Sequence, residues 1–522
     1  MNGHFDEALA QLPQYLGWHM VITVLSLALG LAISLPLGLL VAKRKTLRWP
    51  VLAFASLVQT IPSIALLALM VAVLTGLNAL LIAITRLDEA PIRAIGFVPT
   101  ITAMTLYSML PILRNTVTGI LGVDADLIEA ADGLGMHPVQ RLFRVELPLA
   151  APVILAGVRT ATVWTVGIAT LATPVGQTCL GNYIFEGLQT RTWSTVLFGC
   201  VVAALLAIVL DQLLGLLESG VARRSRVRIV AAAVLLLLVI AGGTAPMAVQ
   251  LEKQRRAALA RVEIGAKTFN ESYVLAQMIG DLLAGDFDVQ QRRGLGSMVA
   301  FDALRNNDLD CYVDYSGTVW ATVMKRDTVP DARTVLHDMT EWLEANHRIR
   351  CLGGLGFENA YALAVRRELA ERFGLKTIED LAAASAKLSI ASDPEFFGRA
   401  EWRSLKATYG LKFREQISMQ STLMYQAVVA GEVDVITAYT SDGRIAAFDL
   451  LVLEDNRAVF PPYEAVLLLS PRAAQRPRLV ARLDPLIGAI DVVSMRQANL
   501  MVDVENRTVG AAARWLTEQI VK

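Results

Sequence analysis

Six apolar stretches of membrane-spanning length occupy the first half of the chain and limit what it can fold into. A helix that crosses a bilayer needs about 20 predominantly apolar residues. Stretches of this kind lie near residues 20–42, 51–74, 96–113, 151–175, 195–217 and 229–249, with a shorter run near 77–84 that would be re-entrant or interfacial. We therefore expect an all-α membrane domain of six spans over 1–250, a linker over 251–261 and a soluble domain over 262–522.

The composition agrees with a membrane protein that carries a soluble domain. With 522 residues the chain is long enough for two or three domains. Hydrophobic residues make up 54% and charged residues 18%, and the mean hydropathy is +0.47. Lys and Arg balance Asp and Glu at 48 each, so the charge predicts no nucleic-acid partner. Residues 1–19 lack the basic start of a signal peptide, so we expect the first apolar stretch to remain as a span.

The four cysteines show neither CxxC nor Cys/His spacing, so we expect no metal site and no cofactor. Cys311 and Cys351 fall in the soluble domain, where oxidising conditions would permit a disulfide. Both lie in apolar segments typical of strands, where a buried free thiol is the ordinary outcome. The sequence leaves their pairing open.

Basic residues in the short loops predict the orientation, because positively charged loops stay on the cytoplasmic side. One basic cluster follows the first span and another follows the fifth, which places the N-terminus and the soluble domain outside. A third cluster, next to the soluble domain, disagrees, but charges beside a large translocated domain orient weakly. The clusters are Lys43, Arg44, Lys45 and Arg48; Arg223, Arg224, Arg226 and Arg228; and Lys253, Arg255, Arg256 and Arg261.

The loop between the third and fourth spans, residues 123–153, carries too many charges to lie in hydrocarbon. Asp126 followed by Glu129 resembles a capping box with Asp in the hydroxyl position, which predicts a helix start. Gly133 and Gly135 supply a stop, and Pro138 suits the first turn of a second short helix. We expect a helix-turn-helix on the cytoplasmic membrane face, available to a soluble partner.

This loop resembles the EAA loop of bacterial ABC importer permeases, through EAA at 129–131, Gly135 and RVELP at 144–148. Upstream, LPILRNT at 110–116 is similar to the permeases for betaine-type osmoprotectants. The resemblance implies a homodimer of two copies, in the bacterial inner (plasma) membrane, bound to cytoplasmic ABC ATPases. No Walker motif occurs in this chain, so the ATPase would be a separate polypeptide and this chain a transporter subunit, not an enzyme. The residues implied in ATPase coupling are Glu129, Ala130, Ala131 and Gly135.

Polar interruptions within the spans mark where a translocation path would run. Gln59 to Ser63, which includes Pro62, and Thr173-Pro174 are the most polar of these. Kinks of this kind are tolerated where neighbouring helices or a cavity satisfy the freed carbonyls. Gly176 to Asn182 has the glycine spacing of a phosphate-binding loop but lacks its lysine and hydroxyl residue, so the match is a coincidence.

From Val262 onward strand and helix patterns alternate, which predicts an α/β domain with ligands at strand ends. Five segments in order resemble the betaine/choline/carnitine-binding proteins of osmoprotectant importers: IGAKTFNES (264–272), ALRNNDLDCYVDYSGT (303–318), GFENAYALAV (356–365), AYTSDGRI (438–445) and FPPYEAVLLL (460–469). This resemblance covers nearly all of 262–522. It implies a two-lobed, periplasmic-binding-protein-like fold, with lobes of 262–355 plus 461–522 and of 356–460, on the periplasmic or extracellular side.

The candidate ligand-binding residues follow from the chemistry of a quaternary ammonium ion. Such an ion cannot donate hydrogen bonds, so proteins hold it by cation–π attraction to aromatic faces. A betaine also has a carboxylate, which requires a guanidinium or hydroxyl and backbone donors. Ser272 stands where the family commonly has glutamine, which leaves the ligand open. The candidates are the cage tyrosines Tyr315, Tyr361, Tyr439 and Tyr463, the anion partner Arg399, and the hydrogen-bond donors Asn270, Ser272 and Ser297.

The favoured interpretation is a fused permease and substrate-binding subunit of an ABC importer. Its small-molecule cargo would be glycine betaine, proline betaine, carnitine, choline or ergothioneine. An importer for an amino acid is the nearest alternative, and it would use acidic and basic anchors in place of an aromatic box. A membrane-anchored solute sensor is a more distant alternative, but it would have no use for an EAA loop. A hydrolase has little support, because the chain has no Gly-x-Ser-x-Gly elbow.

Overall fold

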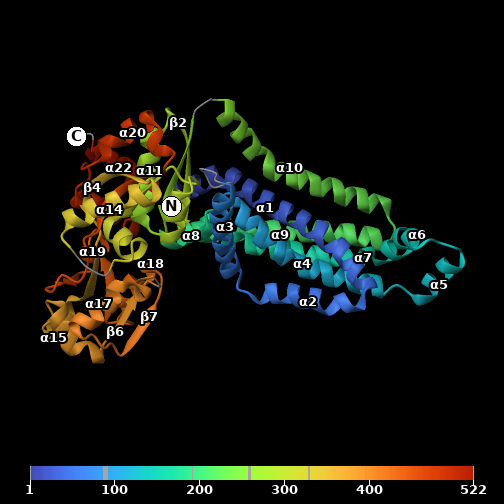
Figure 1. The fold of residues 1–522 in the computed structure, drawn as a ribbon, viewed down its shortest axis with the longest axis horizontal. Coiled ribbons are helices and arrows are strands. Elements are labelled where there is room, and N and C mark those ends of the chain that lie inside the picture. The colour runs from blue at the N-terminus through green and yellow to red at the C-terminus, as the bar shows by residue number, and fades with distance from the viewer. Residues whose placement is uncertain are drawn as a thin grey trace. The chain divides into compact units, whose positions relative to one another are not determined.

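The computed structural model describes residues 2–85, 92–190, 192–256, 260–326, 330–393 and 395–520. It divides into two compact units, Met1–Glu186 with Ser194–Ala258, and Gly187–Trp193 with Leu259–Lys522. The first unit is helical, and the second contains every strand of the described residues (Figure 1). The expected order of a helical domain followed by an α/β domain is therefore confirmed.

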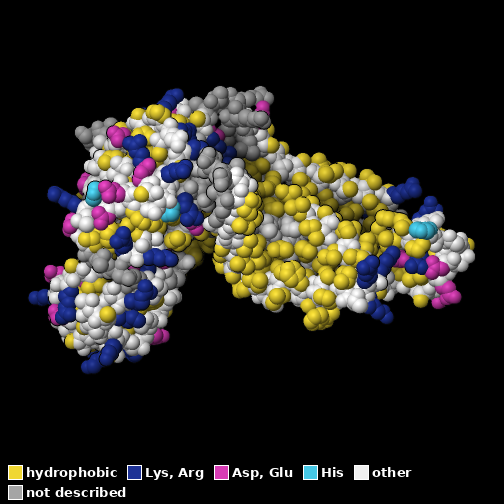
Figure 2. Space-filling view, viewed as in Figure 1, with side chains coloured by type: hydrophobic (Ala, Val, Ile, Leu, Met, Phe, Trp, Pro, Cys, Tyr) yellow, Lys and Arg dark blue, Asp and Glu magenta, His cyan; other side chains and the backbone are white. Residues whose placement is uncertain are grey.

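Long helices with apolar outer surfaces form the first unit. α1 packs against α4 and α10, and α4 also packs against α7. Figure 2 shows hydrophobic side chains covering the side of this bundle, while charged side chains gather near α5 and α6. An exposed apolar surface of this extent suits contact with lipid. The long helices are α1 (Asn2–Lys43), α2 (Lys45–Thr60), α3 (Ser63–Thr85), α4 (Phe97–Leu121), α7 (Leu147–Ala169), α9 (Trp193–Ala222) and α10 (Arg226–Arg256), and the shorter α8 spans Gly181–Gln189.

Fewer than six spans are confirmed. Four segments of the described residues are long and apolar enough to cross a membrane: Phe5–Lys43, Pro138–Val175, Trp193–Ala222 and Arg226–Val249. A fifth would be the pair Lys45–Thr60 and Ser63–Asn78, which is bent by 104°. The stretch expected as one span at 51–74 is therefore broken. The cause is Pro62, which disfavours helical geometry at the preceding residue, and Ile61 is indeed extended.

Several boundaries differ from those expected from the sequence. α1 begins at Asn2 and so includes the residues that precede the first apolar stretch. The run at 77–84 is part of α3. The expected linker 251–261 is mostly regular structure, because α10 continues to Arg256 and β1 begins at Ala260. Residues 251–256 are good helix formers without glycine or proline, so nothing stops the helix earlier.

The charged loop contains α5 (Ala125–Gly133), which Asp124 caps by accepting a hydrogen bond from the Asp126 N–H at 3.0 Å. The cap is therefore Asp124, not Asp126. Gly135 ends the helix with a left-handed φ of +74°. α6 (Pro138–Arg141) begins with proline as expected, but it runs through the π-helical turn η1 (Leu142–Glu146) directly into α7. The second element is thus the start of a long helix.

Two five-stranded mixed sheets form the lobes of the second unit. The sheet of lobe 1 has the order β2-β1-β3-β10-β4, and that of lobe 2 has the order β7-β6-β8-β5-β9. β10 and β5 run antiparallel to their neighbours, whereas β1 and β6 pair in parallel. The strands are β1 (Ala260–Lys267), β2 (Phe287–Leu295), β3 (Cys311–Tyr315), β4 (Arg350–Glu358), β5 (Tyr361–Arg366), β6 (Ser389–Ser392), β7 (Glu415–Ser418), β8 (Val435–Tyr439), β9 (Leu450–Leu453) and β10 (Glu464–Leu469).

The chain crosses between the lobes twice in the described residues, from β4 to β5 and from β9 to β10. β4 ends at Glu358, so lobe 1 extends slightly beyond the expected boundary at 355. The C-terminal helices return to lobe 1, where they pack against α11. The helices covering the sheets are α11 (Asn270–Leu283), α12 (Ser297–Arg305), α14 (Ala332–His347), α15 (Arg367–Phe373), α16 (Ile378–Ala384), α17 (Ala400–Tyr409), α18 (Ser421–Ala430), α20 (Pro477–Leu483), α21 (Val492–Asp503) and α22 (Val509–Ile520), and α13 (Ser316–Thr318) and α19 (Arg444–Ala447) are single turns.

Cys311 and Cys351 lie on opposite sides of one strand. Cys311 on β3 pairs with Leu469 of β10, and Cys351 on β4 pairs with Leu468 of β10. Two strand spacings separate them, about 10 Å, which exceeds the Cα separation of about 7 Å that a disulfide can bridge. Both cysteines are free thiols.

Candidate functional site

A cavity of about 220 Å³ lies between the two lobes of the second unit. Six of the eight predicted ligand-binding residues line it: the four tyrosines, Arg399 and Ser297. They lie together because each residue stands at the end of a strand, on a crossover between the lobes or at the start of a helix. These element ends meet at the cleft. The full lining is Lys267, Thr268, Phe269, Ser297, Tyr315, Thr318, Asn359, Tyr361, Asp393, Glu395, Arg399, Gln420, Tyr439 and Tyr463.

The aromatic residues form two walls. Tyr361 begins β5 and contacts Tyr439 at a centroid distance of 4.9 Å and Tyr463 at 5.7 Å, the latter edge to face. These three rings make one wall. Phe269 and Tyr315 belong to lobe 1 and pack at 6.0 Å to form the other wall. Because the rings within a wall touch each other, a ligand cation would lie against their outer faces, not between neighbours.

All four tyrosine hydroxyls donate to buried carboxylates. Tyr361 and Tyr439 share Asp393, at 3.3 and 3.2 Å. Tyr315 donates to Glu271, and Tyr463 donates to Glu401. Burial raises the pKa of all four phenols well above the ordinary value, so the rings remain neutral donors. An anion behind a phenol makes the electrostatic potential at the ring face more negative, which strengthens its attraction for a cation.

Arg399 is buried and held by two acids. One guanidinium nitrogen, Nη2, lies 2.8 Å from Glu395, and Nη1 lies 3.5 Å from Glu401. The guanidinium also lies 5.3 Å from the Tyr361 ring centroid. Burial alone would lower the pKa of Arg399, but the charges of Glu395 and Glu401 help to hold it well above the ordinary value. Its Nε and Nη1 are buried and have no hydrogen-bond partner among the described residues.

The charges around the cavity favour a cation. Lys267 forms a buried ion pair with Asp314, so its charge is neutralised locally. Two acids, Asp393 and Glu395, line the cavity beside Lys267 and Arg399. Glu271 and Glu401 lie directly behind the cage tyrosines. The acids thus outnumber the bases in contact with the lining, and a cation is the complementary ligand.

Asn270 and Ser272 lie behind the cavity wall and not in it. The amide of Asn270 donates to Asp503. The hydroxyl oxygen of Ser272 accepts the backbone N–H of Lys267 at 2.8 Å, which fixes the turn between β1 and α11. The Ser272 hydroxyl is thus engaged by the protein, whereas Oδ1 of Asn270 is buried without a hydrogen-bond partner among the described residues.

Sequence reasoning missed Asp393, Glu395 and Phe269. Phe269 stands within the first quoted motif, and its place directly after a central strand was an available signal. Asp393 and Glu395 follow β6 and precede Arg399, so strand-end position was again a signal. The pairing of Asp393 with Tyr361 and Tyr439 was not predictable, because these residues lie on three separate strands or strand ends.

The predicted coupling residues lie on a separate, exposed element. Glu129, Ala130 and Gly135 are exposed, whereas Ala131 is buried. Arg141 pairs with Asp132 and Glu146, which ties the end of α5 to the start of the following long helix. The described residues contain no group of three or more His, Cys, Asp or Glu side chains that could hold a metal ion.

Family models match both parts of the chain. Residues 34–223 match the model described as binding-protein-dependent transport system inner membrane component. Residues 260–518 match the substrate binding domain of ABC-type glycine betaine transport system. The two matches together leave only the chain ends and residues 224–259 uncovered.

Curated relatives have the same architecture or its permease half. The chain is 27% identical to the ergothioneine transport permease/ergothioneine binding protein EgtU of Helicobacter pylori, over 92% of this chain and 84% of that protein. It is 39% identical to the choline transport system permease protein OpuBB of Bacillus subtilis, over 38% of this chain and 83% of that protein.

One solved structure, titled as a glycine betaine/carnitine/choline ABC transporter, is 29% identical, covers 49% of this chain and 97% of its own, and has a TM-score of 0.44. The permease match, the binding-domain match and the relative that spans both parts lead to one conclusion. This chain belongs to the osmoprotectant-type ABC importers for betaine-like solutes, as a fusion of the inner-membrane permease with the substrate-binding domain.

Proposed function

We propose that the cavity between the lobes binds the trimethylammonium group of a betaine-like solute, as the first step of ATP-driven uptake. The observation that carries this proposal is the set of four cavity tyrosines whose hydroxyls all donate to carboxylates. A permanent cation with methyl groups gains cation–π attraction there without needing hydrogen bonds. A primary ammonium is more strongly hydrated, so its desolvation on entering the cavity would cost more.

The carboxylate end of a betaine would meet Arg399. Two of its nitrogens are buried without a hydrogen-bond partner among the described residues, and a carboxylate can accept from both. Ser297 lies nearby, and its hydroxyl donates a hydrogen bond to Glu395 at 3.3 Å. The cargo classes that fit are glycine betaine, carnitine and ergothioneine, each with both groups, and choline, which has only the cation. EgtU, which is similar over most of this chain, makes ergothioneine the first ligand to examine.

Isothermal titration calorimetry on the full-length protein in detergent tests this proposal. The panel contains ergothioneine, glycine betaine, carnitine and choline, with the dimethyl and unmethylated analogues of glycine betaine. We expect a trimethylammonium compound to bind most tightly and affinity to fall with each methyl group removed. If an unmethylated amino acid binds best, the site belongs to an amino-acid importer and the cage assignment fails.

Tyr409 offers a matched control for the cage. Its hydroxyl also donates to a carboxylate, Asp455, but it does not line the cavity. Tyr361→Ala should weaken binding and Tyr409→Ala should not. Equal losses would show that the effect comes from destabilised lobe 2 and not from a lost cage face.

We further propose the arrangement of the membrane part. α4 would be a sixth span beside the four that length and hydropathy support and the bent pair Lys45–Thr60 and Ser63–Asn78, with its lower hydropathy due to polar residues such as Arg114 and Asn115. The exposed α5 and its turn would dock onto a separate cytoplasmic ATPase through Glu129, Ala130 and Gly135, while the buried Ala131 would support this surface from beneath. The binding domain would lie on the periplasmic or extracellular side. Two copies would form the translocation unit, with a path near the Pro62 break and Thr173-Pro174.

The mass of the purified complex with its ATPase tests this assembly. Native mass spectrometry should give two copies of this chain with two ATPase chains. A stable complex of one chain with one ATPase would refute the homodimer.

A further inference from the structure

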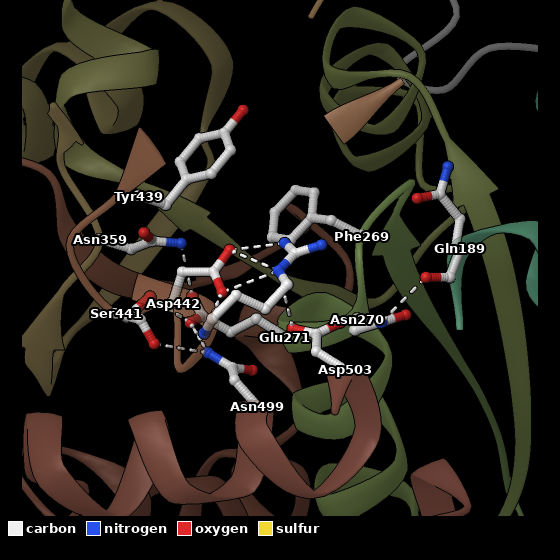
Figure 3. A pocket seen from close by; sticks show the side chains of 11 residues that line it. Gln189, Phe269, Asn270, Glu271, Asn359, Tyr439, Ser441, Asp442, Asn499 and Asp503 are labelled. Atoms are coloured by element: carbon white, nitrogen blue, oxygen red, sulfur yellow. Dashed lines mark hydrogen bonds and ion pairs between the residues drawn. The ribbon is translucent and has the colours of Figure 1, made fainter. Parts of the chain in front are cut away.

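The two lobes meet at a buried carboxylate behind the cavity. Glu271, in the first turn of α11, belongs to lobe 1 and is 4% exposed. It accepts four hydrogen bonds from side chains of four separate elements. Figure 3 shows three of them, with dashed lines that link Glu271 to Asn359, Ser441 and Asn499. The fourth comes from the cage residue Tyr315.

The four donors come from both lobes and from the crossover between them. Tyr315 ends β3 in lobe 1, and Asn359 lies on the crossover from β4 to β5, 3.0 Å from Oε1 of Glu271. Ser441 follows β8 in lobe 2, and its hydroxyl is 2.5 Å from Oε2. Asn499, on α21 of lobe 1, donates to Oε2 at 2.8 Å and to the Ser441 carbonyl at 3.0 Å.

The loop that carries Ser441 fits closely against lobe 1. A Cβ on Gly443 would lie 2.8 Å from Cβ of Leu500 and 2.9 Å from the Arg496 carbonyl oxygen, so only glycine permits this approach. Arg496 donates from Nε to the Thr440 carbonyl at 2.9 Å. The same loop turns back to the crossover, because the Thr440 hydroxyl accepts the N–H of Ala360 at 2.9 Å.

We propose that Glu271 is a positioning residue that holds the two lobes and the cage ring of Tyr315 in the binding geometry, at the pivot of the clamp. This deepens the proposed function and rests on it for the ligand, but not for the lobe geometry. A carboxylate can accept at both oxygens, which no neutral side chain of the same size can do. In Glu271→Gln one oxygen becomes an NH₂ donor that faces two other donors, so two of the four bonds are lost.

The test measures the lobe separation and the ligand affinity of the full-length protein in detergent. Spin labels at Glu344→Cys on α14 and Lys387→Cys, both exposed, report the distance between lobes 1 and 2 by electron–electron resonance, in a background with Cys200→Ser and Cys351→Ser. Glu271→Gln should broaden the ligand-free distance distribution and weaken binding on the order of tenfold. Ser441→Ala should broaden it as well, with a smaller loss of affinity, because it removes one donor of lobe 2 and leaves Tyr315 in place.

Asp393→Asn is the matched control. Asp393 is another buried acid behind cage tyrosines, but all its partners belong to lobe 2: the hydroxyls of Tyr361 and Tyr439 and the backbone N–H groups of Glu395 and Phe396. It should lower the affinity while leaving the ligand-free distances unchanged. If Glu271→Gln and Ser441→Ala both leave those distances unchanged, the proposal is overturned, whatever happens to the affinity. Should Glu271→Gln fail to fold, Ser441→Ala and Asn499→Ala decide the question by the same measurement.

A failure of the proposed function gives a different result. If the wild-type protein binds no trimethylammonium compound, the cage assignment fails, but the ligand-free distances of the variants still support or overturn the role of Glu271.

Discussion

The charged loop proposed for ATPase coupling and the cavity proposed for the ligand are built in opposite ways. α5 and its turn are continuous in sequence, exposed, and shaped by local signals: a capping Asp124, a left-handed Gly135 and a proline at the start of α6. The cavity draws its lining from positions between 267 and 463, and most of these side chains are buried. An element that is continuous in sequence can be recognised from one short motif. A site assembled from distant residues shows only its separate parts in the sequence.

The difference also concerns how a substitution acts. In the loop, most side chains face solvent. Substituting an exposed one should therefore affect only the binding of a partner protein. In the cavity, each polar side chain satisfies another one, so removing one leaves a buried group without its partner. The following predictions sharpen this contrast or would break it, in order of decreasing effect.

The largest effect is expected in the loop. Glu129→Lys should reduce uptake to background in cells that carry the complete importer, because it reverses an exposed charge on the docking surface. Ligand affinity and the thermal unfolding of the purified protein should remain unchanged. Uptake assays with labelled ligand, beside calorimetry, check both parts.

Gly135 gives a control for this loop. A Cβ there would contact nothing within 4 Å, but the φ of +74° is strained for most residues. Gly135→Asn tolerates this φ and Gly135→Val does not. If both abolish uptake, bulk at the docking surface is the cause; if only Gly135→Val does, the turn geometry is. Normal uptake in Glu129→Lys and Gly135→Val would refute the docking assignment.

Arg399→Ala should separate ligands by their anionic group. Loss of a charge-assisted hydrogen bond costs about 1.5–3 kcal/mol, so glycine betaine should bind on the order of 10–100-fold more weakly. Choline has no carboxylate and should bind as before, or more tightly because Glu395 and Glu401 lose their counter-charge. Calorimetry with both ligands decides, and an equal loss for both would exclude Arg399 as the carboxylate partner.

Tyr361→Ala should weaken the binding of either ligand by about 1–2 kcal/mol, or roughly 5–30-fold, because a ring face is lost. Tyr→Phe substitutions should differ among the four positions. Tyr361→Phe should reduce the affinity little, because Asp393 still accepts the hydrogen bond from the Tyr439 hydroxyl. Tyr463→Phe should cost more, because Glu401 loses its hydrogen-bond donor. Equal affinities in the two Phe variants would show that the acids behind the rings have no influence.

The smallest effect concerns pH. Burial raises the pKa of the Asp393 carboxyl, and Arg399 partly opposes this shift. A bound cation favours the ionised carboxylate, so affinity should fall several-fold as the pH decreases from 7 toward about 4, near the ordinary Asp pKa. For stability the sign is opposite: a raised pKa in the folded state favours folding at low pH, and this contribution is lost as the pH rises through the raised pKa. Asp393→Asn should flatten the pH dependence of affinity, and a profile unchanged from wild type would exclude Asp393.

The sequence predicted the helical and α/β parts, the family, the exposed charged loop and six of the residues around the cavity. These properties depend on composition, on local turn chemistry, or on side chains at strand ends. The errors were also local in origin. Asp124 and Asp126 are both suitable caps, and the bend at Pro62 did not interrupt the apolar pattern from which a single span was expected.

Only the tertiary structure decided how the polar groups pair. It showed that each cage tyrosine donates to a carboxylate and that Arg399 is already held by two glutamates. It also showed that Ser272 fixes the turn behind the cavity and that Asn270 donates to Asp503. It also placed Cys311 and Cys351 on either side of β10. The physical reason is the same in each case: hydrogen bonds and ion pairs act over about 3 Å between residues that can be 100 or more positions apart. Composition and periodicity carry no information about such pairs. The sequence therefore determined which functional groups were present, and the fold determined which of them bond to one another and which can contact a ligand.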